Sequence, residues 1–232
     1  MKALLLDLDD TLLAYSAGVD VSWAEACGVA SLPIEKDTLV ATLAETRKWF
    51  WSGDPERHAR ERVDMLGAWT KIAARALERC GDPDPRTAAA LAEIYAARRR
   101  AAWRLFPEAM SFLTRLHEQR IPLALVTNGD ARHQRDKIAR HDLARWFDAI
   151  LIEGETGYGK PEEMVYREAL RRLGVGAAEA WMIGDHIEFD VGAPQRLGLR
   201  GVWVDRAGAG VPANAGVVPH RIVRDLSEML DR

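Results

Sequence analysis

Cysteine is scarce in this sequence, which has only Cys27 and Cys80 among its 232 residues. Two cysteines are too few for a disulfide framework, and these two are too far apart in sequence for a CxxC metal or redox site. We therefore expect both to be reduced thiols in a cytoplasmic protein, where they serve as small residues of the core.

The sequence also lacks an excess of charge of one sign and any long apolar run. Its 32 basic and 35 acidic residues give a formal net charge of −3, so no global electrostatic feature points to nucleic acid as a partner. No apolar run approaches the length of a membrane span, and Asp7 comes too early for a secretory signal. We expect a cytoplasmic monomer or homodimer with no membrane and no nucleic-acid partner.

What the sequence does contain is a series of short apolar runs, most of which end in a polar residue or glycine. Continuous rather than alternating hydrophobicity is typical of strands buried on both faces, as in a parallel sheet. Amphipathic stretches with helical spacing lie between the runs, for example at 110–116 and 164–173. This alternation predicts a doubly wound, mostly parallel α/β fold. The predicted strands are 3–6, 121–126, 149–152, 180–183, 201–204 and, more weakly, 222–223.

About a hundred residues separate the first two predicted strands, far more than one crossover connection needs. Helix signals fill this interval: Asp-Pro pairs at 54–55 and 84–85 are typical starts, and Gly81 is a typical end. They predict one helix from about 54 to 81 and another from 84 to about 103. The first would bury one apolar face, formed by Val63, Leu66, Trp69, Ala73 and Ala76. We expect residues 15–104 to form a small helical cap domain, and residues 1–14 and 105–232 to form the α/β core.

Asp7 and Asp9 come directly after the first predicted strand. Residues two apart in extended backbone project to the same side, so we expect the two carboxylates to converge. Close carboxylates repel unless a cation lies between them, which suits a metal site or a nucleophile beside a general acid/base. The alternative is that these are turn and cap residues, since Asp is common after a strand. For Asp10 we prefer that alternative.

Polar side chains also follow the next predicted strands, at the edge where open α/β sheets bind ligands. Thr127 and Asn128 follow the second strand, Lys160 lies in the loop after the third, and Asp185 and Asp190 follow the fourth. The hydroxyl and amide could donate to a phosphoryl group, the lysine could offset its charge, and the acids could ligate magnesium. Each residue has an alternative as a turn, a helix cap or a solvated charge. Four coincidences at successive strand ends favour a phosphoryl site.

Together these residues resemble the four motifs of the haloacid dehalogenase-like (HAD) hydrolase superfamily. The run Asp7-Leu8-Asp9-Asp10-Thr11 matches Asp-x-Asp-x-Thr, and Thr127 follows a hydrophobic strand as the second motif requires. Gly159-Lys160-Pro161 matches the third motif, and Gly184-Asp185 with Asp190 the fourth. The resemblance covers the expected core, about residues 1–14 and 105–232, and implies that the insert is a helical C1-type cap.

The resemblance implies a phosphatase that hydrolyses a small-molecule phosphate monoester through an aspartyl-phosphate intermediate. Asp7 would be the nucleophile and Asp9 the general acid/base. Thr127 would bind the phosphoryl group, with Asn128 as a further donor, and Lys160 would stabilise the charged nucleophile. Magnesium chemistry agrees with this arrangement, since the ion polarises phosphoryl oxygens and neutralises their charge.

Magnesium, the cofactor that the resemblance implies, would be held by Asp7, the backbone carbonyl of Asp9, and Asp185, with Asp190 as a further ligand or an acid beside the ligands. Two residues depart from the fourth motif: His186 stands where Ser or Thr is usual, and Phe189 where a polar residue is common. Neither removes a required ligand, although they leave the part played by Asp190 open.

Other activities remain as alternatives. Dehalogenases of this superfamily lack the second acid of the first motif, so Asp9 favours phosphate-ester chemistry. A phosphomutase shares the motifs but needs a cap that excludes water. A phospho-accepting receiver domain of a signalling system also places acids, a Thr and a Lys at a sheet edge, but it is short and has no insert. A catalytically silent binding protein is a further possibility on any such fold.

Substrate selection is expected in the insert, where two groups of residues stand out. The aromatic run at 49–51 could stack on a substrate, but packing within the cap or onto the core is the preferred interpretation. The basic group of Arg98, Arg99, Arg100 and Arg104 could face an anion, but a solvated helical face is preferred.

Overall fold

The computed structural model describes residues 2–30 and 32–230. The chain divides into two compact units. One combines the residues up to 14 with those from 104 onward, and the other consists of residues 15–103. The second unit therefore ends one residue before the limit suggested by the sequence.

The first unit is built on an all-parallel sheet with the order β3-β2-β1-β4-β5-β6, as far as the described residues go. Every run of continuous hydrophobicity identified in the sequence forms a strand, so the predicted α/β fold is confirmed. The structure moves the bounds by at most two residues. The strands are β1 (Ala3–Leu6), β2 (Leu123–Thr127), β3 (Ala149–Ile152), β4 (Ala180–Gly184), β5 (Arg200–Val204) and β6 (Arg221–Val223).

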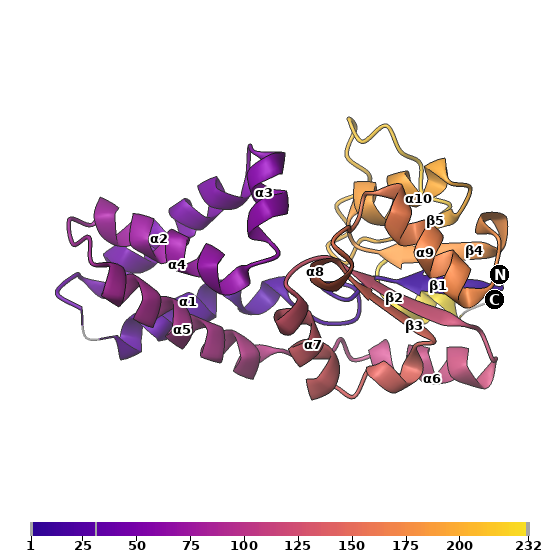
Figure 1. Cartoon of the computed structure of the whole chain (residues 1–232), viewed down its shortest axis with the longest axis horizontal. Coiled ribbons are helices and arrows are strands. Elements are labelled where there is room, and N and C mark those ends of the chain that lie inside the picture. Colours follow the sequence, from indigo (N-terminus) through magenta and orange to yellow (C-terminus); the bar gives the residue numbers. More distant parts are fainter. Residues whose placement is uncertain (1, 31, 231–232) are drawn as a thin grey trace. The chain divides into compact units, whose positions relative to one another are not determined.

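Helices cover both faces of this sheet, which explains why its strands are apolar on both sides. All four residues of β1 are buried. Helices α9 (Glu163–Leu173) and α10 (Ala193–Arg196) lie on one face, and α6 (Ala109–Glu118) lies on the other (Figure 1). Helix α9 buries Tyr166 and Leu170 in the core as its period predicts, but Met164 is 58% exposed.

The order of the strands places β1 in the middle of the sheet, between β2 and β4. From β1 the chain builds outward to β2 and β3 on one side, and to β4, β5 and β6 on the other. The strand order therefore reverses between β1 and β4, and ligands of open α/β sheets bind at such a switch point, beyond the carboxyl ends of the strands. Asp7, which follows β1, lies at that position.

Three helical segments complete this edge of the sheet. Helix α7 (Ala131–Arg140) begins at Asp130, whose carboxylate accepts a hydrogen bond from the His133 backbone N–H at 2.7 Å. Asp130 is therefore the cap of this helix. Helix α8 (Glu153–Thr156) follows β3 directly, and a π-helical turn spans Ile187–Gly192 after β4.

The second unit is helical, as expected, and has its own hydrophobic core. Its buried aromatic residues include Trp23 and Tyr95, whose rings stack with centroids 3.8 Å apart. Asp84 caps a helix that starts with Pro85, as predicted. Both cysteines belong to this unit, and both are free thiols. The helices are α1 (Val19–Val29), α2 (Lys36–Trp51), α3 (Pro55–Glu61), α4 (Met65–Arg79) and α5 (Pro85–Ala102).

The single helix predicted from 54 to 81 is wrong, because the chain breaks it into α3 and α4. Asp64 starts the second helix by accepting a hydrogen bond from the Gly67 N–H at 3.0 Å. A Cβ at Gly67 would lie 2.1 Å from the Asp64 carboxylate, so glycine permits this cap. Trp69, Ala73 and Ala76 are buried as predicted, but Val63 and Leu66, which lie at the break, are 38% and 47% exposed.

The aromatic run of α2 packs mainly within its own unit, as preferred from the sequence. Phe50 is buried and Trp51 packs against the same core. Trp49 is 46% exposed and lies between the guanidinium groups of Arg57 and Arg75, 4.6 and 4.0 Å from its ring.

The predicted solvated basic face is wrong for Arg99. This side chain is 1% exposed, donates a hydrogen bond to the Tyr15 carbonyl at 2.6 Å, and lies over the Tyr15 ring. Its neighbours Arg98 and Arg100 are exposed as expected. In the part of the chain that the structure describes, no helix is both long and apolar enough to cross a membrane.

Candidate active site

The turn after β1 fixes Asp7 at the edge of the sheet. Its backbone N–H donates to the Ile183 carbonyl of β4 at 3.0 Å, so the main chain still follows the sheet at this residue. The Asp7 carboxylate is buried and accepts a hydrogen bond from the Thr11 hydroxyl at 3.1 Å. Asp10 lies in the turn between them with a φ of 56°, and no helix begins there. Asp10 is thus a turn residue rather than a helix cap.

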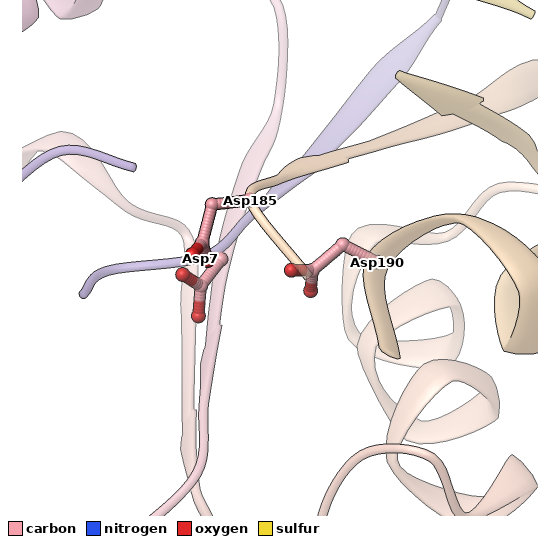
Figure 2. Close-up of side chains that lie close together, drawn as sticks. All are labelled: Asp7, Asp185 and Asp190. Carbon is pink, nitrogen blue, oxygen red and sulfur yellow. The ribbon is translucent and has the colours of Figure 1, made fainter. Parts of the chain in front are cut away.

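Three acids meet in front of this edge. Asp7, Asp185 and Asp190 each offer one carboxylate oxygen within 4.8 Å of the others. Figure 2 shows the Asp190 carboxylate directed toward Asp7 and Asp185 from the helical turn that follows β4. Asp7 and Asp190 are buried, and Asp185 is partly exposed. The structure therefore brings together the three carboxylates expected to hold a metal, and the expected contact through the Asp9 backbone carbonyl stays a prediction.

Lys160 joins two of these acids. Its ammonium donates to an Asp7 oxygen at 2.7 Å and to an Asp190 oxygen at 2.6 Å, and its side chain is 3% exposed. The alternative of a solvated charge is therefore wrong for Lys160. Burial alone would lower its pKa, but the charges of Asp190 and Asp7 raise the pKa above the ordinary lysine value. The ammonium remains charged in the site.

Asn128 holds the backbone that carries Lys160. Its side-chain N–H donates to the Lys160 carbonyl at 2.6 Å, and its side-chain oxygen accepts from the Lys160 N–H at 2.7 Å. Both ends of the amide are therefore engaged with the lysine segment. The expected contact of Asn128 with a phosphoryl group stays a prediction.

The π-helical turn after β4 explains the two departures from the fourth motif. The His186 N–H donates to Asp190 at 2.9 Å, and the His186 ring accepts from the Phe189 N–H at 3.2 Å. The two rings stack with centroids 3.9 Å apart. A Cβ at Gly184 would lie 2.2 Å from the Asp190 carboxylate, so only glycine lets Asp190 approach. His186 and Phe189 thus support the turn that delivers Asp190.

The electrostatics of the acid group favour a bound cation. Burial raises the pKa of Asp7, which Lys160 lowers in part and Asp190 raises again. Burial also raises the pKa of Asp185, and the charges of Asp7 and Asp190 add to the effect. One ammonium cannot neutralise three carboxylates. A divalent ion with a preference for hard oxygen ligands fits this donor set.

Asp9 faces away from this group, toward helix α7. Both of its carboxylate oxygens accept from the Lys137 ammonium, at 2.8 and 2.6 Å, and one also accepts from the Gln134 amide at 3.1 Å. Lys137 is 1% exposed and Asp9 is 27% exposed at the side chain. Gln134 also donates to the buried Thr127 hydroxyl at 2.5 Å. Helix α7 therefore connects two of the predicted site residues.

Sequence reasoning missed Gln134 and Lys137. Their spacing from each other and from the buried Ile138 puts all three on one face of a helix. That periodicity was available in the sequence, but a glutamine and a lysine on a helix most often face water. Another missed residue is Glu153, whose carboxylate accepts from the Gly129 N–H at 2.9 Å and so fixes the turn after β2.

A distant loop also holds the turn after β1. Arg206, which follows β5, donates to the Asp10 and Thr11 carbonyls at 3.2 and 2.7 Å. Its guanidinium group lies 3.3 Å from the centroid of the Phe106 ring and pairs with Glu108 at 2.8 Å. The backbone of the first motif is therefore held by hydrogen bonds to β4 and to the loop that follows β5.

A buried acid at a switch point, paired with a lysine and facing two further acids, is an arrangement that could hold a metal ion and that suits phosphoryl transfer. Known proteins agree with that class. The model of the haloacid dehalogenase-like hydrolase family matches residues 1–198. A phosphoserine phosphatase of Thermus thermophilus is 33% identical, over 99% of this chain and 98% of its own length.

A glyceraldehyde 3-phosphate phosphatase of Methanopyrus kandleri is 29% identical, over 100% of this chain and 96% of its own length. Among solved structures, the HAD-hydrolase YfnB of Bacillus subtilis shares the fold with a TM-score of 0.77 at 21% identity, covering 98% of this chain and 96% of that one. The chain belongs to the haloacid dehalogenase-like hydrolase family and is a hydrolase of the phosphatase type. The resemblance drawn from the motifs is thus confirmed.

Proposed function

We propose that this phosphatase is magnesium-dependent and hydrolyses a small-molecule phosphate monoester through a phosphoryl group carried on Asp7. The observation that carries the proposal is the contact of Asp7 with Lys160, beside Asp185 and Asp190, at the switch point of the sheet. The Lys160 ammonium offsets part of the rise that burial causes in the pKa of Asp7, which favours the ionised form needed for attack, and the neighbouring acids provide oxygen ligands for a cation.

The proposed reaction has two steps with Asp7 and Asp9 in distinct parts. In the first, an Asp7 oxygen forms a bond to phosphorus, the bond from phosphorus to the ester oxygen breaks, and Asp9 gives that oxygen a proton. In the second, water attacks the phosphorus of the aspartyl-phosphate while Asp9 takes the water's proton. Inorganic phosphate leaves, and the Asp7 carboxylate is restored. Lys160 and the Thr127 hydroxyl bind phosphoryl oxygens in both steps.

Asp7, Asp185 and the Asp9 carbonyl are the proposed magnesium ligands, with Asp190 as a further ligand or a neighbour that orients Lys160. The fit rests on the excess of carboxylate over ammonium in this group. When bound, the ion polarises the phosphoryl oxygens and neutralises negative charge in the transition state.

Substrates of the proposed class are short organic phosphates. The two relatives that align along almost their whole length are named for phosphoserine and glyceraldehyde 3-phosphate, both monoesters of three-carbon alcohols. We assign the selection among such esters to the helical unit, residues 15–103, as the cap domain of the enzyme. An assay on these two compounds tests the substrate class directly.

The test of the proposal is release of inorganic phosphate from phosphoserine, glyceraldehyde 3-phosphate and p-nitrophenyl phosphate, with magnesium and with excess chelator. We expect repeated turnover that chelator abolishes and added magnesium restores. Full activity in chelator would contradict the metal assignment. A phosphomutase would instead return an isomeric ester without net phosphate release, and a receiver domain would be labelled once without turnover.

A further inference from the structure

Two residues of α7 contact Asp9, on the side of the proposed site away from Asp185 and Asp190. Gln134 and Lys137 are both buried, and they contact each other, since the Lys137 ammonium donates to the Gln134 side-chain oxygen at 2.6 Å. Each also contacts Asp9. A buried amide and a buried ammonium need partners of this kind, so the contacts alone are compatible with a structural role.

The hydrogen bonds of Gln134 restrict how the Thr127 hydroxyl can act. The Gln134 amide nitrogen faces three oxygens: the Asn128 carbonyl at 2.9 Å, an Asp9 carboxylate oxygen and the Thr127 hydroxyl. The two hydrogens of this nitrogen are shared among the three oxygens, and the nitrogen itself does not accept, so the Thr127 hydroxyl hydrogen cannot be directed at it. The hydroxyl hydrogen of Thr127 is then directed to another acceptor. A phosphoryl oxygen beyond the end of β2 meets that need.

The contacts of Lys137 restrict Asp9 in a similar way. Asp9 lies in the turn after β1, where its side chain is partly exposed. Two N–H···O contacts from one buried ammonium, with a third from Gln134, hold its carboxylate at a defined position. A displacement of about 1 Å in a reacting group can cost roughly 10²-fold in rate. Holding Asp9 therefore bears directly on proton transfer.

We propose that Gln134 and Lys137 are positioning residues for the reaction: Gln134 turns the Thr127 hydroxyl hydrogen toward the phosphoryl group, and Lys137 with Gln134 holds the Asp9 carboxylate. This inference rests on the proposed function, because it assigns tasks to Thr127 and Asp9 as phosphoryl donor and acid/base. It adds that α7 couples the phosphoryl-binding hydroxyl to the proton-transfer group through one side-chain network.

The test for Lys137 compares Lys137→Met with Arg140→Met. Arg140 is the control because it is an exposed cationic residue on the same helix. Kinetics are measured on phosphoserine, an alkyl ester, and on p-nitrophenyl phosphate, whose leaving group needs less protonation. For Lys137→Met we expect kcat on the alkyl ester to fall by about 10²-fold and on the aryl ester by about tenfold or less, with KM little changed. Arg140→Met should retain the wild-type ratio of the two rates. Lys137→Arg, which keeps the charge, should lie between wild type and Lys137→Met.

The test for Gln134 uses an isosteric change. Gln134→Glu preserves the shape of the side chain but replaces the donor with an acceptor, whereas Gln134→Leu removes both. If the N–H groups orient Thr127, both variants should raise KM and lower kcat on both esters, each by roughly tenfold. A purely packing role predicts that Gln134→Leu, which adds no charge beside Asp9, keeps wild-type kinetics. Melting curves on every variant separate loss of folding from loss of rate.

The outcomes distinguish this inference from the proposed function. A wild-type protein that releases no phosphate from any of the esters would overturn the proposed function and the inference with it. An active wild-type protein whose Lys137→Met and Lys137→Arg variants keep the wild-type ratio of alkyl to aryl rates would overturn the role of Lys137 alone. Wild-type kinetics in Gln134→Leu would overturn the role of Gln134.

Discussion

Both units bury charged side chains, but the surroundings of these charges differ. In the sheet unit, Lys160 lies against Asp7 and Asp190, with all three side chains buried. In the helical unit, Arg99 is buried against the Tyr15 carbonyl and ring, and Glu61 is buried against Lys71, whose own side chain is 56% exposed. The sheet unit therefore gathers charges of both signs in one group, whereas Arg99 and Glu61 of the helical unit each have separate partners.

The carboxyl groups respond to these surroundings in opposite directions. A hydrogen bond from Lys71 lowers the pKa of Glu61, so its ionised form suits the fold. Burial and neighbouring acids raise the pKa of Asp185, so its ionised form lacks a partner there. Carboxyl groups with a raised pKa, like Asp185, are concentrated at functional sites, where a ligand supplies the missing positive charge. The comparison thus separates carboxylates that stabilise a fold from those that await a ligand.

The largest expected effect is the loss of activity in Asp7→Asn, compared with Glu61→Gln in the helical unit. Without the carboxylate no covalent intermediate can form, so we expect no detectable turnover of any ester by a folded protein. Glu61→Gln should lower the melting temperature, since it weakens a charged pair, and should leave kcat close to wild type. Phosphate release and melting curves on both variants test this. Turnover by Asp7→Asn would contradict the assignment of Asp7 as the nucleophile.

A smaller loss is expected for Asp9→Asn, which keeps the nucleophile but removes proton transfer. Such groups contribute typically about 10²–10⁴ in rate. The loss should be greater for an alkyl phosphate than for p-nitrophenyl phosphate. Asp10→Asn is the matched control, because asparagine tolerates the positive φ at that position. Equal losses on the two esters would mean that Asp9 is not the acid.

Magnesium removal should change stability as well as rate. In metal-free protein the raised pKa values of Asp7 and Asp185 mean that the folded state binds more protons than the unfolded state above the ordinary carboxyl range. Stability should therefore fall as pH rises, which melting curves in chelator between about pH 5 and pH 8 can measure. Added magnesium should raise the melting temperature most at the higher pH.

Asp185→Asn sharpens this test. The variant lacks one of the carboxyl groups that burial disfavours, so its metal-free stability should fall less with pH than that of wild type. Its response to magnesium should be weak. A variant that magnesium stabilises as strongly as wild type would show that Asp185 is not a ligand.

The smallest effects on catalysis are expected from the aromatic run of α2. Phe50→Ala removes a buried ring and should cost about 3–5 kcal/mol of stability. Trp49→Ala removes a half-exposed ring between two arginines and should cost about 1 kcal/mol or less. Thermal melts with kinetics on a small ester check both. A changed ranking of substrates in Trp49→Ala, with an unchanged melting temperature, would assign Trp49 to substrate selection.

The sheet and the polar residues at its edge could be predicted because their signals are local. A continuously apolar strand that ends in a polar residue, such as 3–6 before Asp7, is visible without knowledge of its neighbours. The parallel arrangement then brings the strand ends to one edge. The topology explains why Asp7, Asp185 and Asp190 lie at the same edge, but the distances between their carboxylate oxygens could not be predicted from it.

What could not be predicted depends on tertiary neighbours. The break between α3 and α4 depends on a cap at Asp64 that lies within a continuous helical periodicity. Arg99, Gln134 and Lys137 have the composition of a solvated helix face, yet each is buried by an element distant in sequence. Polar residues of this kind are recognised only when their partners are known, here Tyr15 for Arg99 and Asp9 for Lys137.

The most direct test of the account is to locate the covalent intermediate on Asp7. Wild type, Asp9→Asn and Asp7→Asn are mixed with p-nitrophenyl phosphate and magnesium, quenched in acid, and examined by peptide mass spectrometry. We expect one phosphoryl group on the peptide that contains Asp7, at higher occupancy in Asp9→Asn because water is no longer activated, and none in Asp7→Asn. A phosphoryl group on another residue, or one retained in Asp7→Asn, would contradict the account.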